Sequence, residues 1–338
     1  MRTSILWILF GAISAAVVGF VVVHKKPHLF EKRGQLPTST ITLLPIFSAL
    51  SMAQKKYGCE GVQMGTVNEK QKTFVAAHWV HKNDIDLLQA GEICSTASYN
   101  VVEVNEFLRA HNFQIQLRDG GPESLYVASI LKIALAWHDK GEKTTLAVNN
   151  KKYPAVRFER RGKQPFKVYD APAGKNGNPI LELAAKNGDM VYMMVAPANQ
   201  EPLREFDLLD SIAMWQQNKI ESAVPYSAVI FPMVSLDQEV DIRWLLGMNF
   251  PTSNGPAQIA QALQQTKFRM NEEGAMVQSA VAIEVQIGIA CPNFNPPPVF
   301  CIDDSFYIWI MRPEMKTPIF AAYVDKSDAW QEPESLEK

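Results

Sequence analysis

Four cysteines among 338 residues are too few for a fold stapled by disulfides, and none forms a Cys-x-x-Cys pair. Neither sign of charge is in excess, since 33 Lys and Arg oppose 35 Asp and Glu. This balance argues against nucleic acid as a partner. Internal repeats and low-complexity stretches are also missing. The hydrophobic content of 47% and charged content of 20% fit a folded globule with a sizeable core.

The usual motifs of catalytic and metal sites are absent as well. The sequence has no P-loop, Gly-x-Gly-x-x-Gly, His-Glu-x-x-His, Gly-x-Ser-x-Gly or EF-hand loop. His78 and His81 form a His-x-x-His, but on the strand that we predict over residues 73–80 they would point to opposite faces. The Asp303-Asp304 pair is typical of a solvated turn. We therefore expect no enzyme, no cofactor and no metal.

One long uncharged run, residues 5–23, stands at the N-terminus. A helix of this length, at about 1.5 Å per residue, is close to the thickness of the hydrocarbon core of a bilayer. We predict a retained single-span anchor with its flanks in residues 1–26, followed by a linker over 27–39. The alternative is a cleaved signal peptide, because residues 12–16 offer small side chains to a peptidase.

Positive charge lies mainly after this run. Arg2 is the only basic side chain before it, whereas four follow closely: Lys25, Lys26, Lys32 and Arg33. This asymmetry favours a single-pass membrane protein with its large domain on the cytoplasmic or matrix side. In a reducing compartment all four cysteines would be free thiols. In an oxidising one, Cys291 and Cys301 could close a short loop.

The pattern of the remaining chain predicts an α+β domain over residues 40–330, with a short tail over 331–338. Apolar spacing indicates helices over 46–57, 101–111 and 206–217. Residues 227–236, 306–311 and 319–324 are typical of strands, and 179–183 with 189–197 of a hairpin. Residues 126–137 fit either a buried strand or a buried helix.

The segment 268–282, FRMNEEGAMVQSAVA, resembles the hinge of the serpins. Further resemblances follow in chain order, at residues 44–61, 104–108, 180–197, 230–234, 245–248, 306–310 and 318–324. The resemblance implies a large mixed central β-sheet with smaller sheets, surrounding helices and a metastable native state. In inhibitory serpins a protease cleaves an exposed reactive loop, which then inserts into the central sheet as a new strand.

The resemblance assigns the reactive-loop hinge and the scissile region. The hinge comprises Glu272, Glu273, Gly274, Ala275, Met276, Val277, Gln278, Ser279 and Ala280. The scissile region falls at Gly288, Ile289 and Ala290. Residues 275–287 alternate as a half-buried strand does, so insertion is physically feasible. A permanent strand would show the same alternation.

Several positions depart from the pattern of inhibitory serpins. The hinge is bulkier than the usual run of alanines, because Met276 and Val277 follow Ala275. The positions where the sheet opens normally hold a polar cluster. Here they hold Leu44, Phe47, Ile133 and Gln264. Neither Arg nor Lys is present in the scissile region, which disfavours a trypsin-like target.

These departures favour a membrane-anchored, non-inhibitory serpin-fold protein. Its expected partners are the membrane and other proteins, and its expected role is that of a binding module or a structural subunit of a membrane complex. The alternative is a protease inhibitor that acts by loop cleavage and insertion on an elastase-like or a cysteine protease.

Overall fold

The computed structural model describes residues 38–121, 124–160, 166–170, 178–198, 200–252, 255–276, 298–326 and 329–333. No helix within these ranges is both long enough and apolar enough to cross a bilayer. The predicted anchor, residues 5–23, lies outside them and stays a prediction.

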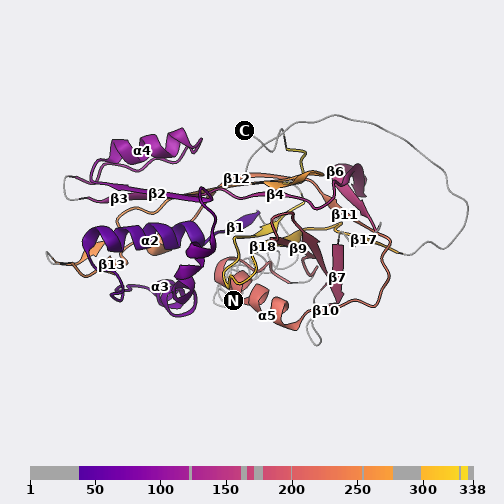
Figure 1. Ribbon diagram of the computed structural model, residues 1–338, viewed down its shortest axis with the longest axis horizontal. Coiled ribbons are helices and arrows are strands. Elements are labelled where there is room, and N and C mark those ends of the chain that lie inside the picture. Colours follow the sequence, from indigo (N-terminus) through magenta and orange to yellow (C-terminus); the bar gives the residue numbers. More distant parts are fainter. Residues whose placement is uncertain are drawn as a thin grey trace, which may run out of the picture. The chain divides into compact units, whose positions relative to one another are not determined.

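Seven strands of the described residues form an antiparallel sheet (Figure 1). Their order across the sheet is β1 (Ser39–Ile41), β19 (Phe320–Val324), β18 (Phe306–Met311), β9 (Met190–Val195), β8 (Ile180–Ala184), β7 (Phe166–Asp170) and β10 (Ile220–Glu221). The predicted hairpin is confirmed as β8–β9, with Gly188 at φ 88° in its turn. The predicted strands at 306–311 and 319–324 are confirmed as β18 and β19.

A second sheet contains four of the described strands. Its order is β17 (Val299–Cys301), β11 (Ala228–Pro232), β6 (Lys151–Glu159) and β5 (Glu142–Val148). The strand predicted over 227–236 is in fact two strands, because the chain leaves this sheet at Met233 and enters another as β12 (Val234–Val240). Met233 is itself buried, so the apolar run is continuous across the change of sheet.

Two further sheets, which we together call the main sheet, share no β-pairing among the described residues. One has the order β12, β15 (Gln264–Met270), β16 (Gly274–Met276) and β4 (Ala134–Ala136). The other is the pair β2 (Ile93–Ser98) and β3 (Tyr126–Leu131). The open choice at residues 126–137 is thereby resolved in favour of strands. A short antiparallel pair, β13 (Asn249–Phe250) with β14 (Ala257–Gln258), precedes β15 in the chain.

Helices enclose the pair β2–β3 on both faces, with α4 (Val101–Ala110) on one side and α2 (Leu44–Tyr57) on the other (Figure 1). Both helices were predicted. Asn100 caps α4 by accepting a hydrogen bond from Val102 N, and Gly58 ends α2 at φ 65°. The third predicted helix is α5 (Glu205–Asn218), whose Trp215 packs on Tyr307 and Trp309 of β18.

The strand predicted over residues 73–80 is wrong. The chain is helical through α3 (Glu69–Thr73), η2 (Phe74–His78) and η3 (Trp79–Leu87). The side chain of Asn68 caps the start of α3. The helical backbone continues because Phe74 is buried in a cluster of aromatic rings, which are Phe47, Trp79, Phe206 and Trp244. Tertiary burial here overrides the strand propensity of the segment. The described residues hold no group of three side chains suited to a metal ion.

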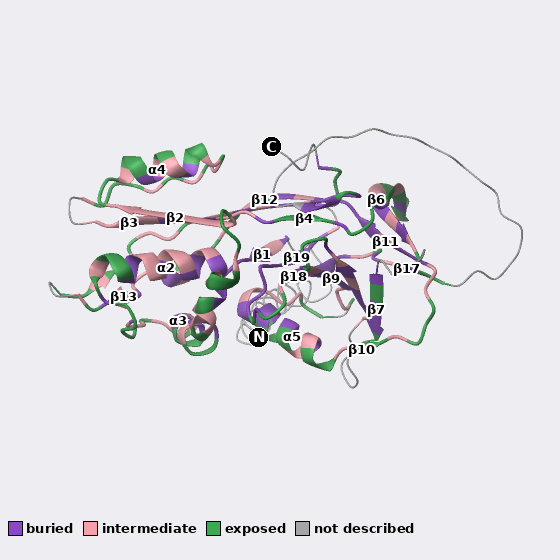
Figure 2. Ribbon diagram, viewed as in Figure 1, coloured by how far each residue is buried: buried purple, intermediate pink, exposed green. Residues whose placement is uncertain are grey.

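Figure 2 shows buried residues concentrated in strands such as β9, β11 and β18, whereas β2 is of intermediate burial and one flank of α4 is exposed. The apolar residues of α4 lie along one side of the helix, where Val104 and Leu108 are buried against β3. Their contacts there are Tyr126, Ala128 and Ile130. The helix thus covers the outer face of β3, and the alternate residues of that strand face α2.

Candidate functional site

The two parts of the main sheet leave a gap, which we call the seam. It lies between β3 and residues 257–267, and no β-pairing joins these two segments within the described chain. Above it, β16 pairs with both β15 and β4 and closes the sheet. The seam is therefore an opening in the main sheet that begins where β16, part of the predicted hinge, ends.

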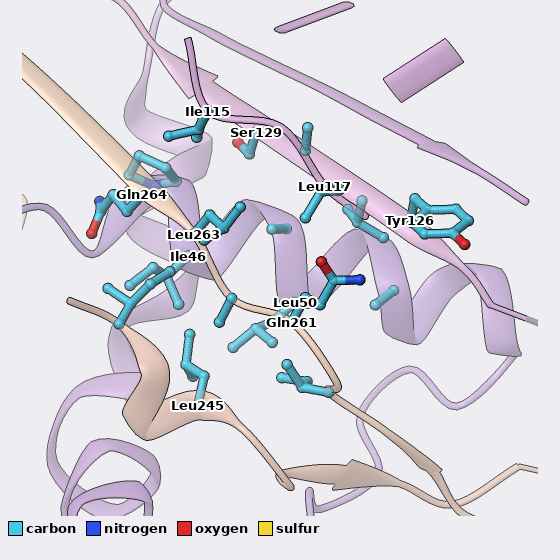
Figure 3. Close-up of a pocket in the computed structure, with 18 of the residues that line it drawn as sticks. Ile46, Leu50, Ile115, Leu117, Tyr126, Ser129, Leu245, Gln261, Leu263 and Gln264 are labelled. Carbon is cyan, nitrogen blue, oxygen red and sulfur yellow. The ribbon is translucent and has the colours of Figure 1, made fainter. Parts of the chain in front are cut away.

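A cavity of about 420 Å³ occupies the seam. Its floor is α2, through Ile46, Ala49 and Leu50, and its roof is the segment that follows α4, through Ile115 and Leu117. Figure 3 shows side chains from these elements, together with Gln261 and Leu263, around a common space. This volume is in the range of binding pockets, and a mainly apolar lining is typical of them.

The edge of β3 that faces the seam carries backbone groups without a strand partner. Lys132 N donates to Glu92 O, just beyond the end of β3. In the antiparallel register, residues 130, 128 and 126 therefore also direct their N–H and C=O groups toward β2. The backbone N–H and C=O groups of Val127, Ser129 and Leu131 consequently face the seam. An unpaired strand edge of this kind is a template for a further strand.

Amide side chains hold the roof in place. Asn105 bonds both the N–H and the C=O of Leu117, at 2.9 Å each. Gln261 does the same with Arg118, at 2.9 and 2.7 Å. Gln265 accepts a hydrogen bond from Gln114 N. Gln261 and Gln265 thus take the place of a backbone ladder between the roof and the wall of the seam, while Asn105 holds the roof to α4.

The structure brings the first part of the predicted hinge into the main sheet. Gly274, Ala275 and Met276 form β16. A Cβ at position 274 would lie 1.8 Å from the carbonyl oxygen of Leu135, so only glycine allows β16 to approach β4 this closely. Ala275 is buried. Glu272 is buried in the preceding turn, whereas Glu273 is exposed.

The remaining loop positions lie outside the described residues. They are Val277, Gln278, Ser279 and Ala280 of the hinge, Gly288, Ile289 and Ala290 of the scissile region, and Cys291. Cys301 lies on β17, where burial raises the pKa of its thiol. Its pairing with Cys291 stays a prediction.

Three of the four sheet-opening positions are buried apolar side chains. Leu44 and Phe47 on α2 have no exposed surface, and Ile133 follows β3 with 2% of its surface exposed. Gln264 is the polar member, and its Nε2 donates to the carbonyl and hydroxyl oxygens of Thr42 at 3.0 and 2.7 Å. Packing therefore dominates around the start of α2.

A row of hydroxyl groups beside these positions was not anticipated from the sequence. Ser48 on α2 bonds Ser95 on β2 at 2.6 Å, and Ser95 bonds Ser129 on β3 at 2.9 Å. Isolated serines carry no sequence signal for such a contact, because the partners lie 47 and 34 residues apart. The row ties α2, the floor of the seam, to β2 and β3.

An ion network around Arg312 was also missed. Its guanidinium donates to both oxygens of Glu92, just before β2, and to both oxygens of Asp189, in the turn before β9. Burial alone would raise the pKa of Glu92, but the hydrogen bonds from Arg312 and from Gln89 N lower it below its ordinary value. The network links β2 to the seven-stranded sheet.

No protein-family model matches this chain, and no curated protein matches it. Solved structures do. A complex of thyroxine-binding globulin with thyroxine has a TM-score of 0.50 at 10% identity, covering 85% of this chain and 92% of its own.

Two serpin structures are similar as well. Serpin48 of the insect Tenebrio molitor has a TM-score of 0.49 at 14% identity, over 86% of this chain and 92% of its own. The thermophilic serpin tengpin has 0.49 at 13%, over 87% and 90%. At identities this low, similarity shows the fold alone. The described chain has the serpin fold, which thyroxine-binding globulin shares with protease inhibitors.

Proposed function

We propose that this chain is a membrane-anchored serpin-fold protein that binds other proteins and does not inhibit a protease. In this proposal residues 5–23 form the anchor, the serpin-fold domain lies on the cytoplasmic or matrix side, and the protein is a binding module or a structural subunit of a membrane complex. The observation that carries the proposal is the seam, a preformed apolar cavity bordered by an unpaired strand edge.

The chemistry of the seam suits an extended polypeptide. Backbone groups of β3 offer hydrogen bonds of any sequence, and the apolar floor and roof offer contacts for side chains on the two faces of a strand. Partners that add a strand to an open sheet edge gain affinity from the main chain and specificity from such side-chain contacts. The seam therefore supports protein binding by strand addition.

Two features oppose the movement that an inhibitor requires. Insertion of a cleaved loop calls for the pair β2–β3 to shift relative to the rest of the molecule, whereas Arg312 fixes the start of β2 to the turn before β9. Leu44, Phe47 and Ile133 replace hydrogen-bonded polar groups by close packing, which resists rearrangement. Both favour a fixed scaffold.

A photo-crosslinking amino acid placed at Val127, on the seam edge of β3, would test the binding site in native membranes. We expect Ala49→Trp, which fills the floor of the cavity, to abolish the crosslinked protein band. Lys55→Trp, on the exposed part of α2, should leave the band intact. Equal crosslinking in both variants would reject the seam as the binding site.

The membrane side can be tested separately by protease protection of sealed vesicles. With the cytoplasmic face outward, we expect complete digestion of the serpin-fold domain. A fully shielded domain would place it on the opposite side, and release of the protein by carbonate would reject the anchor.

Protease inhibition is the second candidate, and the register of β16 favours it. Met276 pairs with Arg269 on one side and Ala134 on the other, so a strand continuing in this register would run into the seam. An inhibitor should form an SDS-resistant complex with an elastase-like or a cysteine protease. Its melting temperature should also rise steeply after a nick within residues 285–294. A binding scaffold should show neither.

A further inference from the structure

The turn between β15 and β16 carries a buried carboxylate with poor pairing. Glu272 is 4% exposed, and its Oε2 has no hydrogen-bond partner among the described residues. Its Oε1 lies 3.7 Å from Lys140 Nζ and 3.6 Å from Lys143 Nζ. A carboxylate removed from water depends strongly on close ion pairs and hydrogen bonds. Glu272 has cations nearby but no short contact with either.

Each of the two lysines is closer to a more exposed carboxylate. Lys140 Nζ lies 2.7 Å from Glu273, and Lys143 Nζ lies 2.7 Å from Glu332. Exposed ion pairs contribute little to stability, whereas an unpaired buried charge is costly. The short contacts are therefore made by Glu273 and Glu332, for which an ion pair contributes less stability than it would for the buried Glu272.

Glu332 is positioned by the C-terminal segment, Ala329–Pro333. Ser235 N of β12 donates to Ala329 O at 3.0 Å. Trp330 is 3% exposed, and its ring packs on Tyr153 of β6 and Phe306 of β18, with centroids 5.0 and 6.2 Å apart. This aromatic anchor contacts two sheets and holds the segment in place. The position of Glu332 over Lys143 is therefore a built feature of the fold.

We propose that the docked C-terminal segment keeps Lys143 away from Glu272 and so holds the β15–β16 turn in a weakly paired state. When the segment leaves its docked position, Lys143 turns to Glu272 and the turn tightens. The C-terminus thereby regulates the turn that leads into β16. This inference does not depend on what occupies the seam.

Hydrogen–deuterium exchange on the full-length chain in detergent tests the proposal. Two amides report on the turn, because Gly141 N donates to Glu272 O at 2.8 Å and Trp137 N donates to Glu273 O at 3.0 Å. We expect Glu332→Gln to slow their exchange about fivefold, since Lys143 is then free to pair with Glu272. Lys143→Met removes the cation altogether and should speed exchange at the same amides.

Glu60→Gln, an exposed loss of the same charge, is the matched control and should change nothing. Trp330→Ala undocks the segment by another route and should slow exchange as Glu332→Gln does. If Glu332→Gln leaves exchange unchanged or speeds it, the proposal is overturned. A uniform change that includes β8 and β9 would also overturn it. Should Trp330→Ala fail to fold, Glu332→Gln decides the question alone.

Discussion

Arg312 and Asp189 form a two-pronged ion pair: Nε donates to Oδ1 at 2.8 Å and Nη2 donates to Oδ2 at 2.9 Å. Asp189 is only 1% exposed, and the same guanidinium also binds Glu92. One side chain therefore bonds two carboxylates from two different sheets and links the start of β2 to the turn before β9.

Replacing Arg312 by Met should destabilise the protein by about 3–5 kcal/mol, because two largely buried carboxylates lose their only shared cation. Urea unfolding of the full-length chain measures this change. The matched control is Arg243→Met, which breaks a similarly shaped but exposed pair with Asp241 and should have no measurable effect. Equal effects in the two variants would contradict the role of Arg312.

Gly274→Ala should disrupt β16. Its Cβ would collide with the backbone of Leu135, and a backbone atom cannot move aside as a flexible side chain can. We expect a loss of about 1–3 kcal/mol and faster exchange of the β4 amides. Gly61→Ala is a suitable comparison, since Gly61 has a positive φ but open space around it. A milder effect at position 274 than at position 61 would refute the close approach.

The stability of the protein should fall as the pH drops below about 6.5. Burial lowers the pKa of His78; the charge of Asp210 partly offsets this lowering, and His81 adds to it. The imidazole packs against Phe206 in a tilted arrangement, with ring centroids 4.7 Å apart. Between the lowered folded pKa and the ordinary value, the unfolded chain binds a proton that the folded chain does not. Stability therefore rises with pH through this window and is fully present above it.

His78→Phe should remove this contribution and flatten the pH profile of the unfolding free energy below about pH 6.5. His138→Gln changes an exposed histidine and should leave the profile as it is. An unaltered slope in His78→Phe would assign the acid sensitivity to another group.

Gln261→Ala should loosen the roof of the seam. The variant loses both hydrogen bonds to Arg118, which contribute about 1 kcal/mol each. Hydrogen exchange of residues 113–119 should accelerate, while that of α2 stays constant. The nearby exposed Gln258→Ala is the control. Unchanged exchange at residues 113–119 would show that apolar contacts of Ile115 and Leu117 suffice to hold the roof.

Local patterns in the sequence predicted the elements whose type is set by residues close together in the chain. The helices at α2, α4 and α5 and the hairpin β8–β9 follow from periodicity, capping residues and turn glycines. The segment at residues 73–80 failed because its apolar side chains meet Phe206 and Trp244, far along the chain, as a helix. A single apolar run across Met233 likewise concealed a change of sheet.

The candidate site was predictable only in part. The burial of Leu44, Phe47 and Ile133 follows from their apolar character. The hinge motif contains Gly274, but it does not predict the close approach of that residue to the backbone of Leu135. The seam itself depends on which strands fail to pair, and Arg312 depends on partners more than 100 residues away. Neither property has a local signature in the sequence.

The roof of the seam has a consequence for how its binding properties can change. Hydrogen bonds between the backbones of paired strands do not involve side chains, so substitutions seldom remove them. The roof is instead attached through the side chains of Asn105, Gln261 and Gln265, each of which a single codon can replace. Access to the cavity can therefore be tuned in small independent steps, by mutation or by design, while the strands around it keep their pairing.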